Sequence, residues 1–350
     1  MNLTAAALAI AVGMTGAGPG TDQVRDAVHR IVDEGHAPAA LVSVQRDGKN
    51  IGYQAGRTPP NAHVRIGSNT KAFVSVVVLQ LVAEGRVDLD GRLDDPRLGG
   101  VTVRQLLQHT SGLPEYTDTI GLDRPDQVRH RYLSPHDLLD VALAKPAQFP
   151  PGTRFQYTNT NYAVLGLLVQ KVTGRPIQEE ITTRVINRLK LRDTYWPAQG
   201  DEGLRQPFAR GVHLADENDP RSAVIDVTTM DPSWAWAAGQ LISTPKDLAS
   251  FYRGLLAGDL LPAAQLAQMR TTVETGAPGV GYGLGLFSTR LSCGVTMWGH
   301  NGGFHGYYSL GGATDTGRAA AVVQTALPGV LGDPAKAEAR VREAQDKALC

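Results

Sequence analysis

The sequence predicts a mixed α/β fold of the α+β type, in which an antiparallel sheet is flanked by helices and carries a mainly helical insertion. Two observations predict it. Strand-like segments lie near both ends of the 350-residue chain, and helical patterns dominate the region between them. We therefore expect one unit over residues 21–350. Its sheet part comes from about 21–67 and 275–350, and its helical part from about 68–274.

The N-terminal elements follow from periodicity. Residues 22–35 (DQVRDAVHRIVDEG) carry apolar residues at helical spacing and end in glycine, which predicts an amphipathic helix. The segments LVSVQ and IGYQAG on either side of DGKN predict two strands joined by a turn. Residues 70–84 are apolar nearly all round and precede Gly85, which predicts a buried helix.

The remaining elements follow from the same rules. Helices are predicted for VTVRQLLQH, SPHDLLDVALAK, TNYAVLGLLVQKVTG and TPKDLASFYRGLLAG. Strands return with YGLGLF, GVTMWGH, FHGYYSLGG and RAAAVVQTA, and residues 334–349 predict a closing helix. Strands that flank a helical middle imply a sheet assembled from both ends of the chain.

Composition and charge exclude several classes of function. The residues are 42% hydrophobic and 19% charged with a formal net charge of zero, so neither nucleic acid nor an anionic membrane is an expected partner. Residues 1–20 resemble the apolar core and cleavage region of a secretory signal, so we expect a leader there and a secreted protein. Without a signal in that segment the protein would be cytoplasmic. No other segment has the roughly 18 apolar residues of a membrane span.

The chain has two cysteines, Cys293 and Cys350. Two isolated thiols are usually free in a cytosolic protein, but a signal-like leader favours a disulfide between them. Such a bond would tie the closing helix to a strand, and the chain-entropy treatment gives a stabilisation of about 4 kcal/mol.

Ser68-Asn69-Thr70-Lys71 stands at the start of the predicted buried helix. Residues three apart share one helical face, so the Lys71 amine can lie beside the Ser68 hydroxyl as base and nucleophile. Backbone N–H groups at a helix N-terminus can also stabilise an oxyanion. A second S-x-x-K, Ser243 to Lys246, is better explained as a helix cap in which Ser243 or Thr244 caps and Pro245 takes the first turn.

Two further motifs each allow two interpretations. In Tyr157-Thr158-Asn159 the Asn159 side chain could cap the next helix, or the phenol could move protons while the amide holds Lys71 or a substrate carbonyl. In W-G-H-N-G-G, Asn301-Gly302 could form a hairpin turn, or His300 and the glycines could form the wall of an active site.

Other kinds of site lack support in the sequence. There is no G-x-S-x-G elbow, no H-E-x-x-H and no Cys/His cluster, so we expect neither a metal nor a cofactor. The aspartates of VDLDGRLDD lack EF-hand spacing and are expected in a solvated loop. Gly281-Tyr-Gly-Leu-Gly is not followed by a helix and so does not predict a nucleotide loop.

Taken in order, S-N-T-K, Y-T-N and H-N-G resemble the three active-site motifs of the serine penicillin-recognising enzymes, the class C β-lactamase-like superfamily (peptidase S12). Within it the chain looks most like D-alanyl-D-alanine carboxypeptidases of Streptomyces type. Supporting phrases such as VTVRQLLQHTSGLPEY, PGTRFQYTNTNYAVLG and WAWAAGQLISTPKDLASF extend the resemblance over residues 22–350.

The resemblance implies a β-lactamase/transpeptidase-like fold and a role for each matched residue. Ser68 would be the acylated nucleophile, Lys71 its proton acceptor and Tyr157 the proton relay. His300 stands where many relatives have lysine, and it would carry a positive charge only below about pH 6 to 7 unless its pKa is shifted. The backbone N–H groups of Ser68 and Gly303 would form the oxyanion hole. Substrate-binding residues would be Asn159, Trp234, Phe287, Asn301, Gly302 and Gly303.

The departures from the family pattern concern the substrate. Related carboxypeptidases carry H-T-G-T and an arginine-rich strand that clamp a terminal carboxylate. Here Asn301, Gly303 and Phe287 stand at those places, with Arg290 three residues further on. The cation and both hydroxyls are therefore missing, and strict carboxypeptidase activity is not expected.

These observations predict a serine hydrolase that forms an acyl-enzyme on Ser68. The expected activity is that of a D,D-peptidase, a D-amino-acid-specific peptidase or a related amide or ester hydrolase. Alternatives are a β-lactamase, a biosynthetic acyl-transferase or peptide cyclase of the same fold, and a non-catalytic penicillin-binding-like module. The expected partner is a small peptide, ester or β-lactam, including cell-wall peptide, and the protein is expected to be a monomer.

Overall fold

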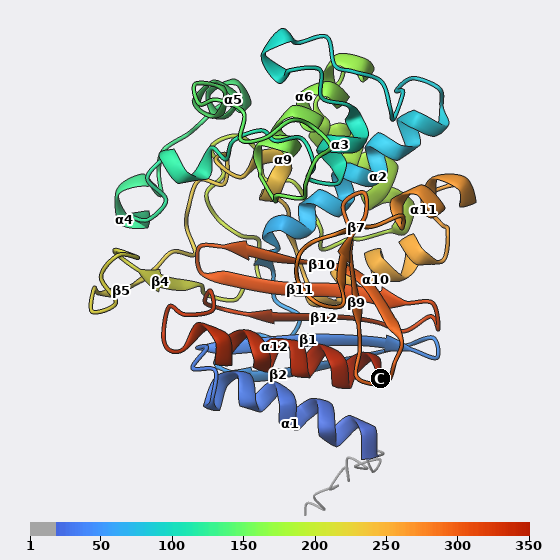
Figure 1. Cartoon of the computed structure of the whole chain (residues 1–350). Coiled ribbons are helices and arrows are strands. Elements are labelled where there is room, and N and C mark those ends of the chain that lie inside the picture. The colour runs from blue at the N-terminus through green and yellow to red at the C-terminus, as the bar shows by residue number, and fades with distance from the viewer. Residues whose placement is uncertain (1–18) are drawn as a thin grey trace, which may run out of the picture.

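An eight-stranded sheet forms the centre of the structure, a computed structural model that describes residues 19–350 (Figure 1). Its strand order is β2-β1-β12-β11-β10-β9-β8-β7, and every neighbouring pair is antiparallel. The strands are β1 (Ala39–Arg46), β2 (Lys49–Gly56), β7 (Val273–Glu274), β8 (Val280–Tyr282), β9 (Phe287–Arg290), β10 (Thr296–Phe304), β11 (Tyr307–Thr314) and β12 (Ala319–Gln324). Two small sheets pair β3 (Val64–Arg65) with β6 (Ile242–Ser243) and β4 (Val212–Leu214) with β5 (Val224–Asp226).

Both ends of the chain meet in this sheet. Near the N-terminus, β1 pairs with β12, so that Ala40 lies opposite Gln324. The antiparallel sheet with flanking helices confirms the predicted fold class. The predicted leader, residues 1–20, lies outside the described residues except for Pro19 and Gly20, which begin α1 (Pro19–Asp33).

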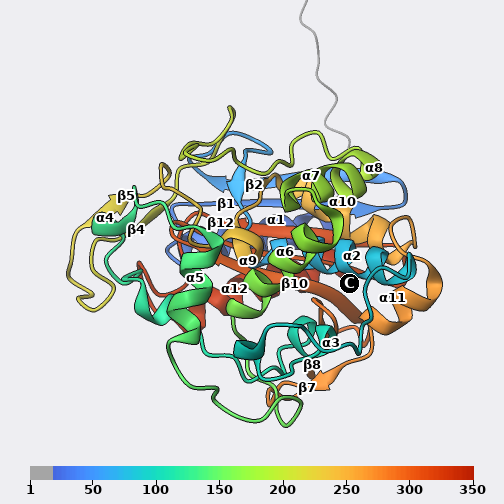
Figure 2. The same cartoon turned by 90° about the horizontal axis from the view of Figure 1, so that it is seen from above.

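Helices cover both faces of the sheet (Figures 1 and 2). On one face lie α1 and α12 (Pro334–Leu349), and on the other lie α10 (Pro245–Leu256) and the helical region. The other α-helices are α2 (Thr70–Ala83), α3 (Val103–Leu107), α4 (Pro125–Val128), α5 (Pro135–Leu143), α6 (Thr160–Thr173), α7 (Ile177–Ile181), α8 (Asn187–Leu189), α9 (Trp236–Gly239) and α11 (Ala263–Met269). Short turns of other helix types are η1 (Gly67–Asn69), η2 (Pro96–Leu98), η3 (Thr117–Thr119) and η4 (Thr182–Ile186).

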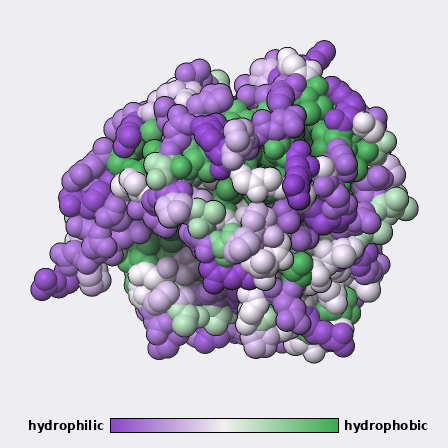
Figure 3. All heavy atoms as spheres, turned by 45° about the horizontal axis from the view of Figure 1, so that its top comes forward, coloured by the Kyte–Doolittle hydropathy of each residue, from purple (hydrophilic) through white to green (hydrophobic). Residues whose placement is uncertain are grey.

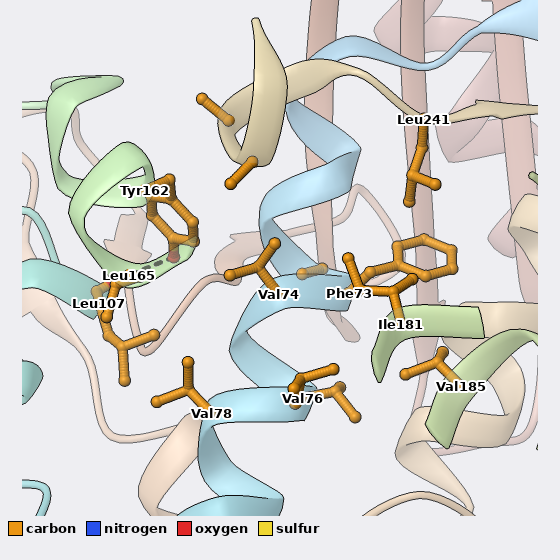
Figure 4. Packing of buried hydrophobic residues seen from close by; sticks show 14 of the residues in the cluster. Phe73, Val74, Val76, Val78, Leu107, Tyr162, Leu165, Ile181, Val185 and Leu241 are labelled. Carbon is orange, nitrogen blue, oxygen red and sulfur yellow. Dashed lines mark hydrogen bonds between the residues drawn. The ribbon is translucent and has the colours of Figure 1, made fainter. Parts of the chain in front are cut away.

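The helix α2 is surrounded by other elements, as its apolar sequence predicts. Figure 4 shows Val74 and Val78 facing Tyr162 and Leu107 on one side, while Ile181 and Val185 lie on the other. The rings of Phe73 and Phe251 stack with their centroids 3.7 Å apart. Close packing on every side fixes the position of the helix N-terminus, where S-N-T-K begins. On the face that Figure 3 shows, most of the surface is hydrophilic and apolar side chains show mainly in recesses.

The last third of the chain differs from the prediction in one strand. Y-G-L-G-L-F is not a single strand, because β8 ends at Tyr282 and β9 begins at Phe287. The residues between them form a turn in which the Gly283 N–H donates to Leu286 O at 2.8 Å. Asn301-Gly302 lies inside β10, and the turn to β11 falls at His305-Gly306 instead. The active-site-wall interpretation of this stretch therefore agrees with the fold, and the hairpin interpretation does not.

The predicted disulfide between Cys293 and Cys350 is present, and the two Cα atoms lie 5.8 Å apart. It joins the turn between β9 and β10 to the end of α12. Among residues 19–350, no helix is long and apolar enough to cross a membrane.

Candidate active site

Ser68 lies in η1, where the chain passes the edge of β10 on its way into α2. The preceding Gly67 has a φ of +49°, a conformation that favours glycine. Gly302 packs closely against this turn, since a Cβ built on it would lie 2.0 Å from Ile66 O and 2.9 Å from Ser68 N. A side chain at Gly302 would therefore push the strand away from the Ser68 backbone. Ser68 itself is half-buried and can be reached from outside.

The Lys71 amine lies beside the Ser68 hydroxyl. Lys71 Nζ is 2.9 Å from Ser68 Oγ, 2.7 Å from Asn159 Oδ1 and 2.8 Å from Ala238 O. The lysine is fully buried, and burial lowers its pKa from 10.5 to about 7, while the charge of Glu115 acts in the opposite direction. At neutral pH a large share of Lys71 is therefore unprotonated and can accept a proton.

Tyr157 completes the group around the serine. Its ring centroid is 4.9 Å from Lys71 Nζ, and the Ser68 side chain is close enough to affect the pKa of its phenol. Desolvation raises the pKa of the Tyr157 phenol well above 10, although the Ser68 side chain lowers it in part. The phenol therefore keeps its proton at neutral pH. Of the two groups beside Ser68, Lys71 is the one that can act as a base and Tyr157 the one that can donate a proton.

Asn159 occupies the cap position of α6 but makes no side-chain cap hydrogen bond there. Its amide oxygen accepts from Lys71, while its Nδ2 and its backbone N–H donate to Glu115 Oε2 at 3.1 and 2.7 Å. Glu115 was not among the predicted site residues, although it stands within the phrase VTVRQLLQHTSGLPEY. It is a half-buried carboxylate whose charge acts on both Lys71 and Tyr157.

A second missed residue, His109, lies behind Tyr157. The two rings are 4.2 Å apart, and His109 Nδ1 accepts from the Thr158 N–H at 3.2 Å. Burial, followed by the charges of Lys71 and His300, lowers the pKa of His109 well below 6.5, so the imidazole is neutral. His109 thus supports the Tyr157 ring without bringing a charge to it. No local pattern marks either His109 or Glu115 as part of a site.

His300 lies in β10 with its ring 6.1 Å from that of Tyr157. Its Nε2 is 3.1 Å from the Tyr282 hydroxyl, and its Nδ1 bonds the carbonyl of Asn301. Burial, reinforced by the charge of Lys71, lowers the pKa of His300 to about 3. His300 is therefore neutral at physiological pH and does not supply the charge that lysine carries at this place in many relatives.

The other predicted substrate-binding residues are not all brought together. The Asn301 side chain bonds Tyr308 Oη at 3.4 Å on the α12 face of the sheet, so only its main chain remains at the β10 edge. Phe287 packs on Tyr282 and His300, with ring centroids 4.5 and 4.9 Å apart. Trp234 stacks on Phe304 at 4.8 Å, one residue beyond Gly303.

The second S-x-x-K serves as a helix cap, as predicted. Thr244 is the N-cap of α10, its hydroxyl accepts from the Asp247 N–H, and Pro245 takes the first turn. The Ser243 hydroxyl bonds Thr194 at 2.8 Å in the interior, and Lys246 is exposed. Ser243 thus lies in the interior and Lys246 at the surface, so the two side chains do not form a nucleophile and base.

Comparisons with known proteins agree with this geometry. The D-stereospecific amidohydrolase from Streptomyces sp. is 37% identical, covers 93% of this chain and 98% of its own, and superposes with a TM-score of 0.83. The D-amino acid amidase from Ochrobactrum anthropi SV3, complexed with L-phenylalanine amide, is 25% identical over 94% of this chain and 98% of its own, with a TM-score of 0.81.

Curated relatives point the same way. Penicillin-binding protein 4 from Amycolatopsis lactamdurans is 28% identical over 79% of this chain and 77% of that protein. Protein flp from Staphylococcus aureus is 27% identical over 49% of this chain, and the match spans only 37% of the length of flp. A family model described as Beta-lactamase matches residues 24–345. The chain therefore belongs to the beta-lactamase family, a serine hydrolase family of the β-lactamase and penicillin-binding-protein fold.

Proposed function

We propose that this protein cleaves amides or esters of D-configured amino acids and peptides through an acyl-enzyme on Ser68. One observation carries the mechanism: Lys71 Nζ lies 2.9 Å from Ser68 Oγ, and burial lowers the pKa of Lys71 to about 7. A nucleophilic serine needs an adjacent base that is unprotonated at the working pH, and Lys71 meets both conditions.

The reaction follows from the placement of these groups. Unprotonated Lys71 takes the Ser68 proton as Oγ attacks the substrate carbonyl. The N–H groups of Ser68 and Gly303 stabilise the oxyanion that forms. Tyr157 gives its proton to the leaving amine and recovers one from Lys71, so the protons balance. Water then attacks the ester with the same groups acting in reverse, and releases the D-amino acid or acyl product.

The substrate class rests on the relatives and on the β10 edge. From His300 to Phe304, β10 pairs only with β11 among the described strands, because β9 begins at Phe287, opposite Gly299. An extended substrate could add main-chain hydrogen bonds at this edge. The apolar Phe287 beside His300 offers no counter-ion to a terminal carboxylate, which favours amides, esters and internal peptide bonds. The names of the two amidohydrolase neighbours support a D-configured acyl group. Secretion and a monomeric state stay predictions.

We expect hydrolysis of D-phenylalanine amide and its methyl ester to exceed that of the L-enantiomers by at least about tenfold, a difference of 1.4 kcal/mol in transition-state binding. Peptides ending in a free D-Ala-D-Ala carboxylate should react more slowly than the same peptides with an amidated end. Initial rates measured by chromatography on this panel, with free and acylated N-termini and with a penicillin, test the proposal. Preference for L-substrates, or turnover of the penicillin alone, would refute it.

Glu115 gives a second test, because it raises the pKa of Lys71. We expect Glu115→Gln to move the acidic limb of the pH profile of kcat/KM to lower pH, while the glutamine can still accept one bond from Asn159. Glu84→Gln removes a carboxylate that pairs with Arg184 at the surface and serves as the control. If the acidic limb of kcat/KM lies at the same pH in Glu115→Gln as in the unmodified protein, a group other than Lys71 determines its position.

A further inference from the structure

Two buried histidines and a carboxylate meet at one end of the sheet, away from Ser68. His213 belongs to β4, Glu217 follows that strand, and His305 stands in the turn between β10 and β11. One potential ligand atom of each side chain lies within 4.8 Å of the other two. The two histidine rings have centroids 4.8 Å apart. Nothing in the proposed hydrolysis uses these groups.

The cluster contains buried nitrogen atoms without partners. The His213 side chain is 1% exposed, and its Nδ1 lies 3.1 Å from Leu214 O, a contact that requires the proton on Nδ1. Nε2 then faces Glu217 Oε1 at 3.0 Å. At this distance His213 Nε2 and the carboxylate attract one another only when a proton or a metal ion lies between them. His305 Nε2 lies 2.9 Å from Leu122 O, so the proton of that ring is on Nε2 and the buried Nδ1 of His305 has no hydrogen-bond partner.

The spacing of the three side chains is close to that around a tetrahedral ion. With bonds of about 2.0–2.2 Å, two ligand atoms on tetrahedral Zn²⁺ lie roughly 3.3–3.5 Å apart. Here Glu217 Oε1 lies 3.0 Å from His213 Nε2, and one potential ligand atom of each of the three side chains lies within 4.8 Å of the other two. The bond from His213 Nδ1 to a carbonyl is the outer contact that orients metal-binding histidines. Glu217 is 41% exposed, which leaves a path for entry and a fourth position for water.

We propose that His213, Glu217 and His305 bind one divalent transition-metal ion, with Zn²⁺ as the best match to two imidazoles and one carboxylate. The ion would tie β4 and its following loop to the β10–β11 turn. That turn follows directly on Phe304, and the Trp234 ring lies 4.8 Å from Phe304 and 5.5 Å from His305. Bound metal would therefore hold in place the end of β10, the strand at which the substrate is proposed to bind, and the Trp234 ring beside it.

The test uses tag-free full-length protein stripped with a chelator. Co²⁺ titration followed by visible d–d absorption reports a tetrahedral site, and Zn²⁺ calorimetry gives stoichiometry and affinity. We expect one equivalent to bind, the melting temperature to rise, and Glu217→Gln to weaken affinity by at least about 10- to 100-fold. Because Glu217 is largely at the surface, this variant should fold, which circular dichroism checks.

The matched control is Glu202→Gln, which removes a carboxylate that lies 2.7 Å from the exposed His130 without a second histidine. Its metal affinity should equal that of the unmodified protein. Absence of stoichiometric binding in the unmodified protein, or equal affinity in Glu217→Gln, would overturn the metal site and identify the cluster as an ion pair. Neither result depends on hydrolytic activity.

Discussion

Replacement of Ser68 by alanine is expected to lower kcat/KM for a D-amino-acid amide by a factor on the order of 10⁴ or more. The reason is that Ser68 Oγ, 2.9 Å from Lys71 Nζ, is the proposed nucleophile, and the acyl-enzyme cannot form without it. Stability should change little, because Ser68 is half-buried and sits in a short turn. Rates of ester and amide hydrolysis measure the loss. Intact-protein mass spectrometry with a slow substrate or a penicillin locates the adduct.

The chain supplies a matched control in its second S-x-x-K. Ser243→Ala removes a buried serine whose hydroxyl bonds Thr194 near the cap of α10 and takes no part in the proposed reaction. We expect it to retain full kcat/KM and an unchanged adduct mass, with a stability loss of about 1 kcal/mol for the hydrogen bond. An adduct that persists in Ser68→Ala, or disappears in Ser243→Ala, would mean that another residue is acylated.

Much of the fold could be predicted from the sequence because its signals are local. The nearly uniform apolar pattern of α2 predicts burial, and α2 is enclosed by other elements. The alternating pattern Y-G-L-G-L-F predicted one strand, and this prediction was wrong. Its glycines allow the chain to turn, and the Gly283 N–H donates to Leu286 O across that turn. Strand alternation also indicates that His300 and Asn301 point to opposite faces, and the structure shows Asn301 on the α12 face.

The site could be predicted only in part, because some contacts depend on tertiary placement. Ser68 and Lys71 share one helical face, so their contact follows from spacing alone. Glu115 and His109 reach the site through an irregular segment whose path no periodicity describes. The neutral state of His300 likewise comes from burial beside Lys71, and this burial could not be predicted from the sequence pattern.

Lys71 is expected to set the pH dependence of activity. Because burial lowers the pKa of Lys71 to about 7, kcat/KM should rise with pH through a midpoint near that value as the amine loses its proton. Lys71→Met should remove most of the activity by leaving Ser68 without a base. Stopped-flow or initial-rate profiles over a wide pH range measure the midpoint. A profile that is flat through neutrality would show that Lys71 is not the base.

The same lysine should also make stability depend on pH, with a sign that can be worked out. The folded pKa of about 7 lies below the ordinary value of 10.5, so between these values the unfolded chain holds a proton that the folded chain has released. The unfolding free energy of the unmodified protein should therefore rise with pH in this window, by up to about 1.4 kcal/mol per unit, relative to Lys71→Met.

Urea unfolding between about pH 7 and pH 9 measures the difference, and subtraction of the two proteins removes the contributions of all other groups. Lys246→Met is the control, because Lys246 is exposed in the folded chain and its loss should leave the slope unchanged. The buried amine thus lowers stability most at acidic and neutral pH, where the cost sums to about 5 kcal/mol across the window. Parallel curves for Lys71→Met and the unmodified protein would mean that Lys71 keeps its ordinary pKa, and a base near neutrality would then have to be sought elsewhere.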